Sequence, residues 1–301
     1  MNNETLARLE NVTVRFGNRM ALHDATFQIE AGEFVGIVGP NGAGKTTAFR
    51  VLQGLQQPTS GSAALLGEPS YPPNRRRNAL VSYQPQHAAL FEQLTVRENV
   101  RLFARFRNQP AQRAETVIER LELEDAADVR QEKLSGGQRQ RLSVACAVVG
   151  NPRVLFLDEP TANVDPLARR SMRTYFKELS AQGMSIVFTS HDPNEVAGLC
   201  DRVIILFNGR VLVDGSPDHI RDTSGLVTLS VRTLLTLDQL AAEDSVVTLA
   251  PTNEGYKVLT RQPERITQAI VDIDAHALVE RQVEPFEETY IRLVEQAGDL
   301  E

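Results

Sequence analysis

A glycine-rich segment near the start of the chain limits the possible folds more than any other part of the sequence. Residues 39–47 read GPNGAGKTT; the apolar run 34–38 comes directly before them, and a helical pattern over residues 47–55 follows. A buried strand, a G-x-x-x-x-G-K-T loop and a helix in this order are typical of a phosphate-binding P-loop. The glycines let successive backbone N–H groups curve around phosphate oxygens at a positive helix N-terminus. The segment therefore predicts a nucleotide site in an α/β domain.

The side chains of this loop have distinct predicted roles toward ATP and Mg²⁺. Lys45 would bridge the β- and γ-phosphates, and the hydroxyl of Thr46 would bind the metal. The loop residues expected to contact nucleotide are Gly39, Asn41, Gly42, Gly44, Lys45, Thr46 and Thr47. The alternative, a glycine-rich turn without function, is disfavoured by the strand and helix patterns on either side.

Two acidic residues end a second apolar strand. The run 154–157 is followed directly by Asp158 and Glu159. An acid at the carboxyl end of a buried strand beside a P-loop is placed to hold Mg²⁺, which assigns this role to Asp158. Glu159 would then reach a water in line with the γ-phosphate. Without the P-loop, both acids could equally be solvated charges at a strand end.

A second helix start with exposed N–H groups precedes this strand. The sequence LSGGQ at residues 134–138 leads into a helical pattern that ends near residue 150. A serine N-cap followed by two glycines makes a second candidate anion site, formed by Ser135, Gly136, Gly137 and Gln138. One nucleotide cannot easily use both sites within a single chain. The economical solution is a head-to-tail dimer, with each ATP between the P-loop of one subunit and the LSGGQ segment of the other.

These motifs, in this order, resemble the ATPase subunit of an ATP-binding cassette (ABC) transporter over residues 4–220. The resemblance implies an α/β fold of the P-loop NTPase class, with antiparallel β and helical subdomains, and ATP hydrolysis by a symmetric homodimer. Glu159 would polarise the attacking water. Phe16 resembles the aromatic residue that stacks on adenine, where the family more often has Tyr; a core Phe before a turn is the alternative.

Gln86 resembles the functional residue of the glutamine loop in this family. Its spacing to the LTV sequence at residues 94–96 favours it over Gln84. The resemblance implies that its amide touches Mg²⁺ or the attacking water when a helical subdomain swings inward. Gln86 would then connect the chemistry to movement.

Two further positions resemble loops that meet the γ-phosphate or the partner subunit. Asp165 matches the loop that crosses to the partner, although Asn163 and Val164 stand where the family usually has Gly-Leu. His191 follows the expected strand 185–189 and matches the switch histidine. The resemblance implies that His191 hydrogen-bonds the γ-phosphate, whereas a lone histidine at a strand end is more often structural.

The distribution of charge divides the chain into two expected domains. Residues 1–221 hold 26 basic and 24 acidic side chains, whereas residues 222–301 hold 6 and 15. Turn-forming Gly, Ser, Pro and Asp residues gather around this boundary. We therefore expect a nucleotide-binding domain over residues 1–221 and a small α+β domain over residues 222–301.

The second domain shows a pattern of short strands and helices. Strands are expected over residues 226–232, 245–250, 256–261 and 276–283, and helices over 236–243, 263–271 and 285–296. The order β-α-β-β-α-β plus one helix indicates a ferredoxin-like domain. The ending VEPFEETY at residues 283–290 resembles the tail of ATPases from ABC-2 type exporters, which export drugs or polymers. We expect this domain to regulate the ATPase or to stabilise its dimer.

The leading hypothesis is a motor subunit that drives export through a separate membrane permease. No apolar run approaches the roughly 18–20 residues that a bilayer crossing requires, so we expect a cytoplasmic protein held at the inner membrane face by its permease. The alternatives are a soluble ABC protein acting on ribosomes or nucleic acid, and an importer ATPase. The basic run 75–77 has no interleaved aromatic residues, so no nucleic acid is expected. Cys146 and Cys200 are expected to be buried rather than disulfide-bonded.

Overall fold

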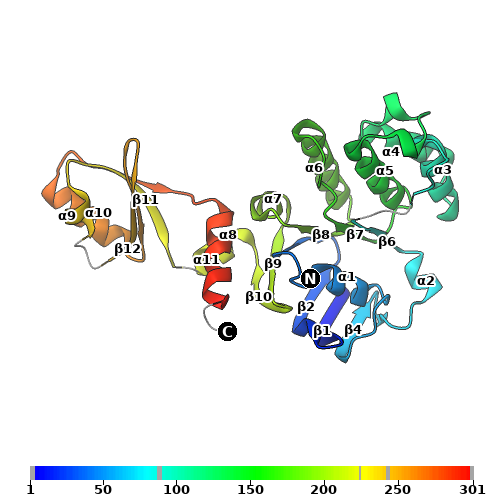
Figure 1. Cartoon of the computed structure of the whole chain (residues 1–301), viewed down its shortest axis with the longest axis horizontal. Helices are drawn as coiled ribbons and strands as arrows, with labels where there is room; N and C mark the ends of the chain where they lie inside the picture. The colour runs from blue at the N-terminus through cyan, green and yellow to red at the C-terminus, as the bar shows by residue number, and fades with distance from the viewer. Residues whose placement is uncertain (1–3, 87–89, 224, 242–244, 299–301) are drawn as a thin grey trace. The chain divides into compact units, whose positions relative to one another are not determined.

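The structure, a computed structural model, describes residues 4–86, 90–223, 225–241 and 245–298 (Figure 1). Contacts between Cα atoms divide the chain into two compact units, Met1–Ser216 and Pro217–Glu301. This division falls slightly ahead of the boundary expected from composition, because helix α8 (Pro217–Thr223) packs within the second unit. Its Ile220 is fully buried, and the guanidinium carbon of Arg221 lies 5.6 Å from the ring centre of Phe286.

A six-stranded sheet forms the centre of the first unit. Its strand order is β10-β9-β3-β8-β7-β6, and all neighbours are parallel except the β9–β10 pair. The strands are β3 (Phe34–Val38), β6 (Val81–Gln84), β7 (Val154–Asp158), β8 (Ser185–Ser190), β9 (Arg202–Phe207) and β10 (Arg210–Gly215). Every residue of β3, β7 and β8 is buried, as expected for apolar strands covered on both faces. The loops after these three parallel strands therefore meet at one edge of the sheet.

An antiparallel sheet with the order β2-β1-β4-β5 completes the core of this unit. Its strands are β1 (Thr5–Phe16), β2 (Arg19–Glu30), β4 (Ser60–Leu65) and β5 (Glu68–Pro69). Helix α1 (Lys45–Leu52) contacts this sheet, and its Phe49 ring centre lies 5.2 Å from that of Phe156 in β7. A shared cluster of buried apolar side chains therefore joins both sheets through α1.

Helix α1 begins two residues before the pattern over residues 47–55 and ends three residues earlier. It begins directly after Gly44, whose φ of 107° is left-handed and breaks the helical path. The chain turns again at Gly54, where φ is 73° and a Cβ atom would lie 2.0 Å from the carbonyl oxygen of Ser70. Glycine conformation therefore sets both ends of this helix.

Helices of the first unit cover the six-stranded sheet and extend beyond β6. Helices α5 and α6 lie above the sheet and α1 below it in Figure 1, and α3, α4 and α5 pack against one another. The helices are α2 (Arg75–Asn78), α3 (Val96–Phe106), α4 (Ala111–Arg120), α5 (Gly136–Val148), α6 (Pro166–Ala181) and α7 (Pro193–Leu199). Two 3₁₀ turns, Glu124–Ala126 and Gln131–Lys133, precede α5. Cys146 and Cys200 are buried free thiols, as expected.

The second unit is an antiparallel sheet with the order β12-β13-β11-β14. It comprises β11 (Val227–Arg232), α9 (Leu237–Ala241), β12 (Val246–Thr252), β13 (Gly255–Thr260), α10 (Pro263–Ile273), β14 (Leu278–Gln282) and α11 (Phe286–Gly298), after α8. Residues 242 and 243 of the expected helix 236–243 lie outside the described residues. The small core contains Leu229, Val231, Leu235, Leu240, Val258, Ile266 and Ile270. Among the described helices of both units, none has the length and apolar character that a membrane crossing requires.

Candidate active site

The loop between β3 and α1 has a backbone that only glycine can provide at key positions. Gly42 and Gly44 have φ angles of 83° and 107°, which are left-handed values. A Cβ atom on Gly44 would lie 2.4 Å from the carbonyl oxygen of Ala21, and one on Gly39 would lie 2.1 Å from that of Leu206. The loop therefore packs tightly on its inner side while its outer side borders a cavity of about 480 Å³. A glycine cradle of this kind at a helix N-terminus fits a chain of phosphates.

The cavity gathers most of the residues predicted to contact nucleotide. Its lining includes Phe16, Asn41, Gly42, Gly44, Lys45, Thr46, Thr47, Gln86 and Glu159. Phe16 is 48% exposed, so it lies at the surface and not in the core, which fits a stacking role better than the alternative of a core residue. Sequence reasoning missed Arg19, a cation from β2 that also lines the cavity. The sequence signal that could have identified Arg19 is a basic residue two positions after Gly17, in the turn that follows Phe16.

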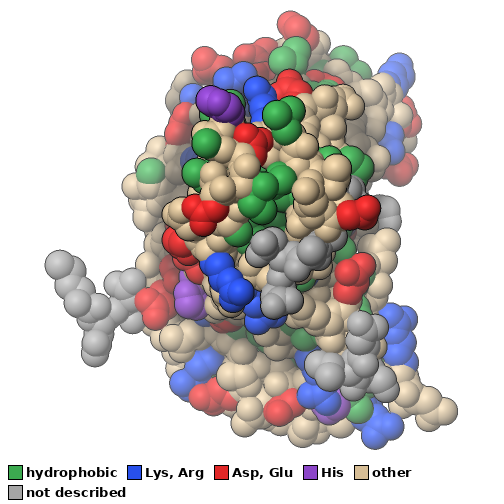
Figure 2. Space-filling view, turned by 90° about the vertical axis from the view of Figure 1, so that its left-hand side faces the viewer, with side chains coloured by type: hydrophobic (Ala, Val, Ile, Leu, Met, Phe, Trp, Pro, Cys, Tyr) green, Lys and Arg blue, Asp and Glu red, His purple; other side chains and the backbone are tan. Residues whose placement is uncertain are grey.

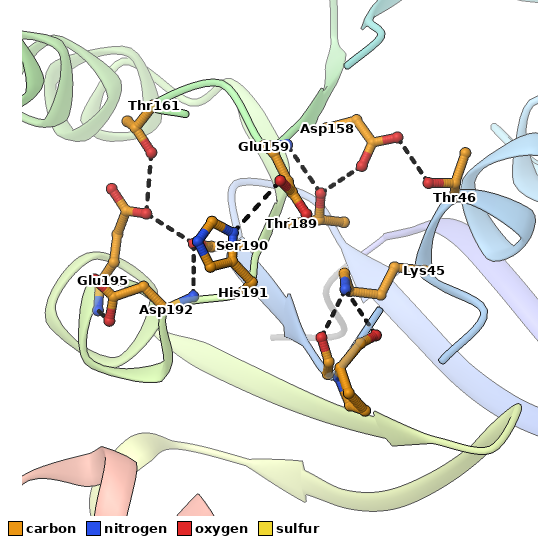
Figure 3. A network of polar contacts seen from close by, with 12 residues as sticks. Lys45, Thr46, Asp158, Glu159, Thr161, Thr189, Ser190, His191, Asp192 and Glu195 are labelled. Carbon is orange, nitrogen blue, oxygen red and sulfur yellow. Dashed lines mark hydrogen bonds and ion pairs between the residues drawn. The ribbon is translucent and has the colours of Figure 1, made fainter. Parts of the chain in front are cut away.

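Lys45 is the buried cation of the cavity. Its Nζ atom donates hydrogen bonds to the carbonyl oxygens of Gly39 at 2.6 Å and Pro40 at 3.2 Å, so the ammonium curls over its own loop (Figure 3). Burial lowers the pKa of Lys45, while the carboxylates of Glu159 and Asp158 act in the opposite direction. A desolvated ammonium beside exposed loop N–H groups is a strong binding group for phosphate.

Asp158, at the end of β7, is held by three hydroxyl groups. Its Oδ2 atom accepts hydrogen bonds from Thr46 Oγ1 at 3.0 Å and from Tyr83 Oη at 3.2 Å, while Oδ1 accepts one from Thr189 Oγ1 at 2.6 Å. Burial, and then the adjacent Asp158 charge, raise the pKa of Tyr83, which keeps its hydroxyl a donor. The paired oxygen atoms of Thr46 and Asp158 are hard ligands that suit Mg²⁺. Sequence reasoning found both of these but missed Tyr83 and Thr189.

Glu159 has a constrained backbone directly after β7. Its φ angle is 51°, an unusual value for a residue other than glycine. Its N–H donates to both the carbonyl and the hydroxyl oxygen of Thr189, at 3.2 and 3.0 Å, and its carbonyl oxygen accepts from Gln140 Nε2 at 3.0 Å. These contacts hold the strained turn in place.

The side chains of Glu159 and His191 meet at a smaller cavity of about 210 Å³, which both line, whereas only Glu159 also lines the P-loop cavity. His191 Nδ1 lies 3.4 Å from Glu159 Oε2 (Figure 3). The Glu159 side chain is 13% exposed, whereas that of His191 is 65% exposed. The structure thus brings together these two residues, which are predicted to act on the water and the γ-phosphate. The imidazole remains accessible from outside the chain.

The LSGGQ segment does not reach the cavity of its own chain. Ser135 and Gln138 instead form a capping box at the start of α5, in which each side chain accepts a hydrogen bond from the other's backbone N–H. An added Cβ atom on Gly136 would meet no atom within 4 Å, so this face of the helix start is open. Neither these residues nor Gly137 line the cavity.

Asp165 also lies outside the cavity, at the start of α6. Its Oδ1 atom accepts hydrogen bonds from the N–H groups of Ala168 at 3.0 Å and Leu167 at 3.1 Å, which hold the pKa of Asp165 below its ordinary value. Asn163 has a φ angle of 60°, a left-handed value that asparagine tolerates better than most residues. Asn163 can therefore replace the usual glycine here, and Val164 is buried as an apolar residue at the next position.

The fold and the site together define a P-loop nucleotide-hydrolysing cassette. The sequence model described as ABC transporter matches residues 22–162. "Nod factor export ATP-binding protein I" of Burkholderia lata is 41% identical over 213 residues, 69% of each chain. The protein of the same name from Bradyrhizobium diazoefficiens is 38% identical over 71% of each chain.

Solved structures agree with these sequence relatives. An ATP-binding subunit of an ABC transporter superposes with a TM-score of 0.68 and 29% identity, over 73% of this chain and 94% of the other. A dimeric ATP-binding cassette, bound to ADP and Pi in a post-hydrolysis state, gives 0.65 and 29% over 70% and 98%. The chain belongs to the ABC transporter family of ATP-binding proteins. It is an ATPase with an ABC cassette fold.

Proposed function

We propose that this chain hydrolyses ATP to drive export through a separate membrane permease. The observation that carries the proposal is one cavity lined by both the P-loop, with Lys45, and Glu159 at the end of β7. A phosphate cradle and a carboxylate beside it supply the positioning and charge that phosphoryl transfer to water requires. Export is supported by the relatives named Nod factor export ATP-binding protein I. The cargo depends on the permease.

The P-loop positions the triphosphate in this mechanism. Lys45 exchanges its bonds to the loop carbonyls for bonds to the β- and γ-phosphates, and the N–H groups around Gly42 and Gly44 hold the remaining oxygens. Thr46, Asp158 and Gln86 would hold Mg²⁺, which would supply positive charge to balance the phosphate oxygens. The ring of Phe16 supplies the apolar surface on which adenine stacks.

Glu159 and His191 act at the γ-phosphate end. The Glu159 carboxylate accepts a hydrogen bond from the attacking water and takes its proton as the water oxygen bonds to the γ-phosphorus. The bond from that phosphorus to the bridging oxygen breaks, and ADP leaves. His191 donates a hydrogen bond to a γ-phosphate oxygen and thereby stabilises the charge that develops there. Their contact at 3.4 Å supports joint action, because it places both side chains at the same end of the site.

A second copy of the chain completes each site. Ser135, Gly136, Gly137 and Gln138 lie outside the cavity of their own chain, at an exposed helix start whose N–H groups suit a γ-phosphate. Asp165 would approach the same interface from α6. The dimeric solved cassette supports pairing of two subunits, and a head-to-tail arrangement of them would bring the LSGGQ segment of one to the P-loop of the other.

Fractionation of cells tests the proposed role in export. Because the motor needs its permease, we expect the tagged full chain to sediment with membranes and to co-purify with a polytopic membrane protein. Co-sedimentation with ribosomes, or with nuclease-sensitive complexes, would contradict the proposal and favour a soluble ABC protein. Co-purification with a permease and a substrate-binding protein would instead indicate an importer.

The C-terminal domain is proposed to stabilise the dimer or regulate coupling. A face in Figure 2 shows apolar side chains among charged ones, and this unit exposes Leu234, Ile273, Leu278 and Val283. We expect a chain without the second compact unit, residues 217–301, to bind ATP with an affinity within about threefold of the full chain, because no cavity residue lies there. Its ATP-driven dimer should dissociate at lower protein concentration. Titration with a fluorescent ATP analogue measures binding, and light scattering measures the dimer; loss of ATP binding by a folded truncation would contradict the prediction.

A further inference from the structure

A buried carboxylate outside the proposed reaction site lies on α7. Glu195 is 5% exposed. Among the residues that the structure describes, Glu195 and Asp158 are the only buried acidic side chains. A buried charge is costly unless other groups compensate it. The proposed role of Asp158 in binding Mg²⁺ explains its burial, whereas Glu195 has no role in the proposed reaction.

The two oxygen atoms of Glu195 have different partners. Oε1 accepts hydrogen bonds from Nε and Nη2 of Arg173 in α6, at 3.0 and 2.8 Å. Oε2 accepts hydrogen bonds from Ser190 Oγ at 2.8 Å and Thr161 Oγ1 at 3.0 Å (Figure 3). Both arginine donors reach the same oxygen atom and balance the charge of the carboxylate, which leaves the other oxygen to the hydroxyl groups. Oε2 is therefore held still as a common acceptor for two hydroxyl groups.

Those two hydroxyl groups belong to the segments that carry the proposed catalytic pair. Thr161 comes two residues after Glu159, and Ser190 comes directly before His191. Both are buried, at 4% and 3% exposure, and with Glu195 they line a small cavity of about 210 Å³ that Glu159 and His191 also border. One carboxylate oxygen thus connects a side chain of the loop after β7 to a side chain at the end of β8. The side chains of Glu159 and His191 also contact each other directly, so these two segments are joined at two places.

The network also extends into the start of α7. The Glu195 N–H donates to Asp192 Oδ1 at 3.1 Å, and the Asp192 N–H donates to Ser190 Oγ at 3.1 Å. The Ser190 hydroxyl is therefore both a donor to Glu195 and an acceptor from Asp192. This arrangement gives the turn that contains His191 one defined conformation.

We propose that Glu195 is a positioning residue that holds Glu159 and His191 at the separation needed for hydrolysis. The inference rests on the proposed function of that pair. Glu195 does not line the cavity that the P-loop borders. We therefore expect it to affect the rate of the chemical step and not the binding of ATP. A displacement of about 1 Å in a catalytic group is sufficient to slow an enzyme by up to about a hundredfold.

Amide hydrogen exchange of the full chain without nucleotide tests the connection itself. Glu195→Gln keeps the shape of the side chain but places an NH₂ donor against either Arg173 or the hydroxyl groups. We expect exchange to rise about tenfold in both segments, 161–165 and 190–193, and to stay unchanged in the P-loop residues 39–47. Faster exchange confined to α6 and α7, with both segments still protected, would overturn the proposal in favour of a purely structural ion pair.

Steady-state ATP hydrolysis provides the functional readout. We expect Glu195→Gln to lower kcat by about tenfold to a hundredfold while KM stays within about twofold. Glu178→Gln, the same substitution on a partly exposed carboxylate that pairs with Arg120, is the matched control and should leave kcat unchanged. An unchanged kcat for Glu195→Gln, or an equal loss in ATP binding, would overturn the proposal.

A pair of substitutions at Thr161 separates positioning from loss of stability. Thr161→Val removes the hydroxyl that reaches Glu195 but keeps the volume, so kcat should fall severalfold. Thr161→Ser retains the hydroxyl and should recover most of that loss; equal activity of the two variants would contradict the role of the hydrogen bond. If the unmodified chain hydrolysed no ATP while exchange rose in both segments, the connection would be supported and the proposed function would fail instead.

Discussion

The Glu159→Gln variant should lose ATP turnover by about 10²–10⁴-fold and still bind ATP. Glutamine has the shape of glutamate, but its amide does not take a proton from the attacking water. The P-loop contacts of Lys45 and Thr46 do not involve this side chain, so the binding site stays intact. Phosphate release measures turnover, and titration with a fluorescent ATP analogue measures affinity.

The control for this variant is a glutamate of similar chemistry away from the cavity. Glu33→Gln changes a carboxylate that contacts Arg202, and it should leave turnover within about twofold of the unmodified chain. Retention of more than a tenth of the turnover by Glu159→Gln would show that another group removes the proton. A loss of ATP binding in step with turnover would assign Glu159 to binding instead.

The Lys45→Ala variant should bind ATP at least about tenfold to a hundredfold more weakly. A hydrogen bond to a charged group is worth about 1.5–3 kcal/mol, and each 1.4 kcal/mol is a tenfold change in affinity. Lys45 is 7% exposed beside the glycine cradle, so water replaces it poorly as a partner for phosphate. Isothermal titration with ATP measures the change.

The exposed Lys177 on α6 provides the matched control for Lys45. Lys177→Ala removes the same charge outside the cavity, so it should leave ATP affinity unchanged. If both variants lost affinity equally, net charge and not the P-loop contact would be responsible. If Lys45→Ala bound ATP normally, the cavity would not be the phosphate site.

The central fold and the P-loop were predictable because their signals are local in sequence. Uniformly apolar runs predicted the buried strands β3 and β7, and glycines marked the loop between β3 and α1. The ends of α1 were wrong in the prediction, because backbone conformation at Gly44 and Gly54 sets them. Helical periodicity continues past Leu52, but the close approach of Ser70 to Gly54 requires the chain to turn there.

The supporting contacts of the site could not be read from the sequence. Tyr83 and Thr189 reach Asp158 from β6 and β8, which flank β7 only after the sheet has formed. Glu195 and Arg173 look like ordinary surface charges on amphipathic helices, and only packing shows that Glu195 is buried. Local patterns identify the groups proposed to touch ATP, whereas the groups that position them come from distant segments.

Light scattering of the Glu159→Gln chain with and without ATP tests the composite site most directly. The account predicts a mass near 33.3 kDa without nucleotide and about twice that value with ATP, because each ATP joins the P-loop of one subunit to the LSGGQ segment of the other. Ser135→Arg in the same background should prevent this change by blocking the exposed start of α5. A mass that stays at one chain while ATP saturates the site, or a dimer that forms equally well with Ser135→Arg, would contradict the account.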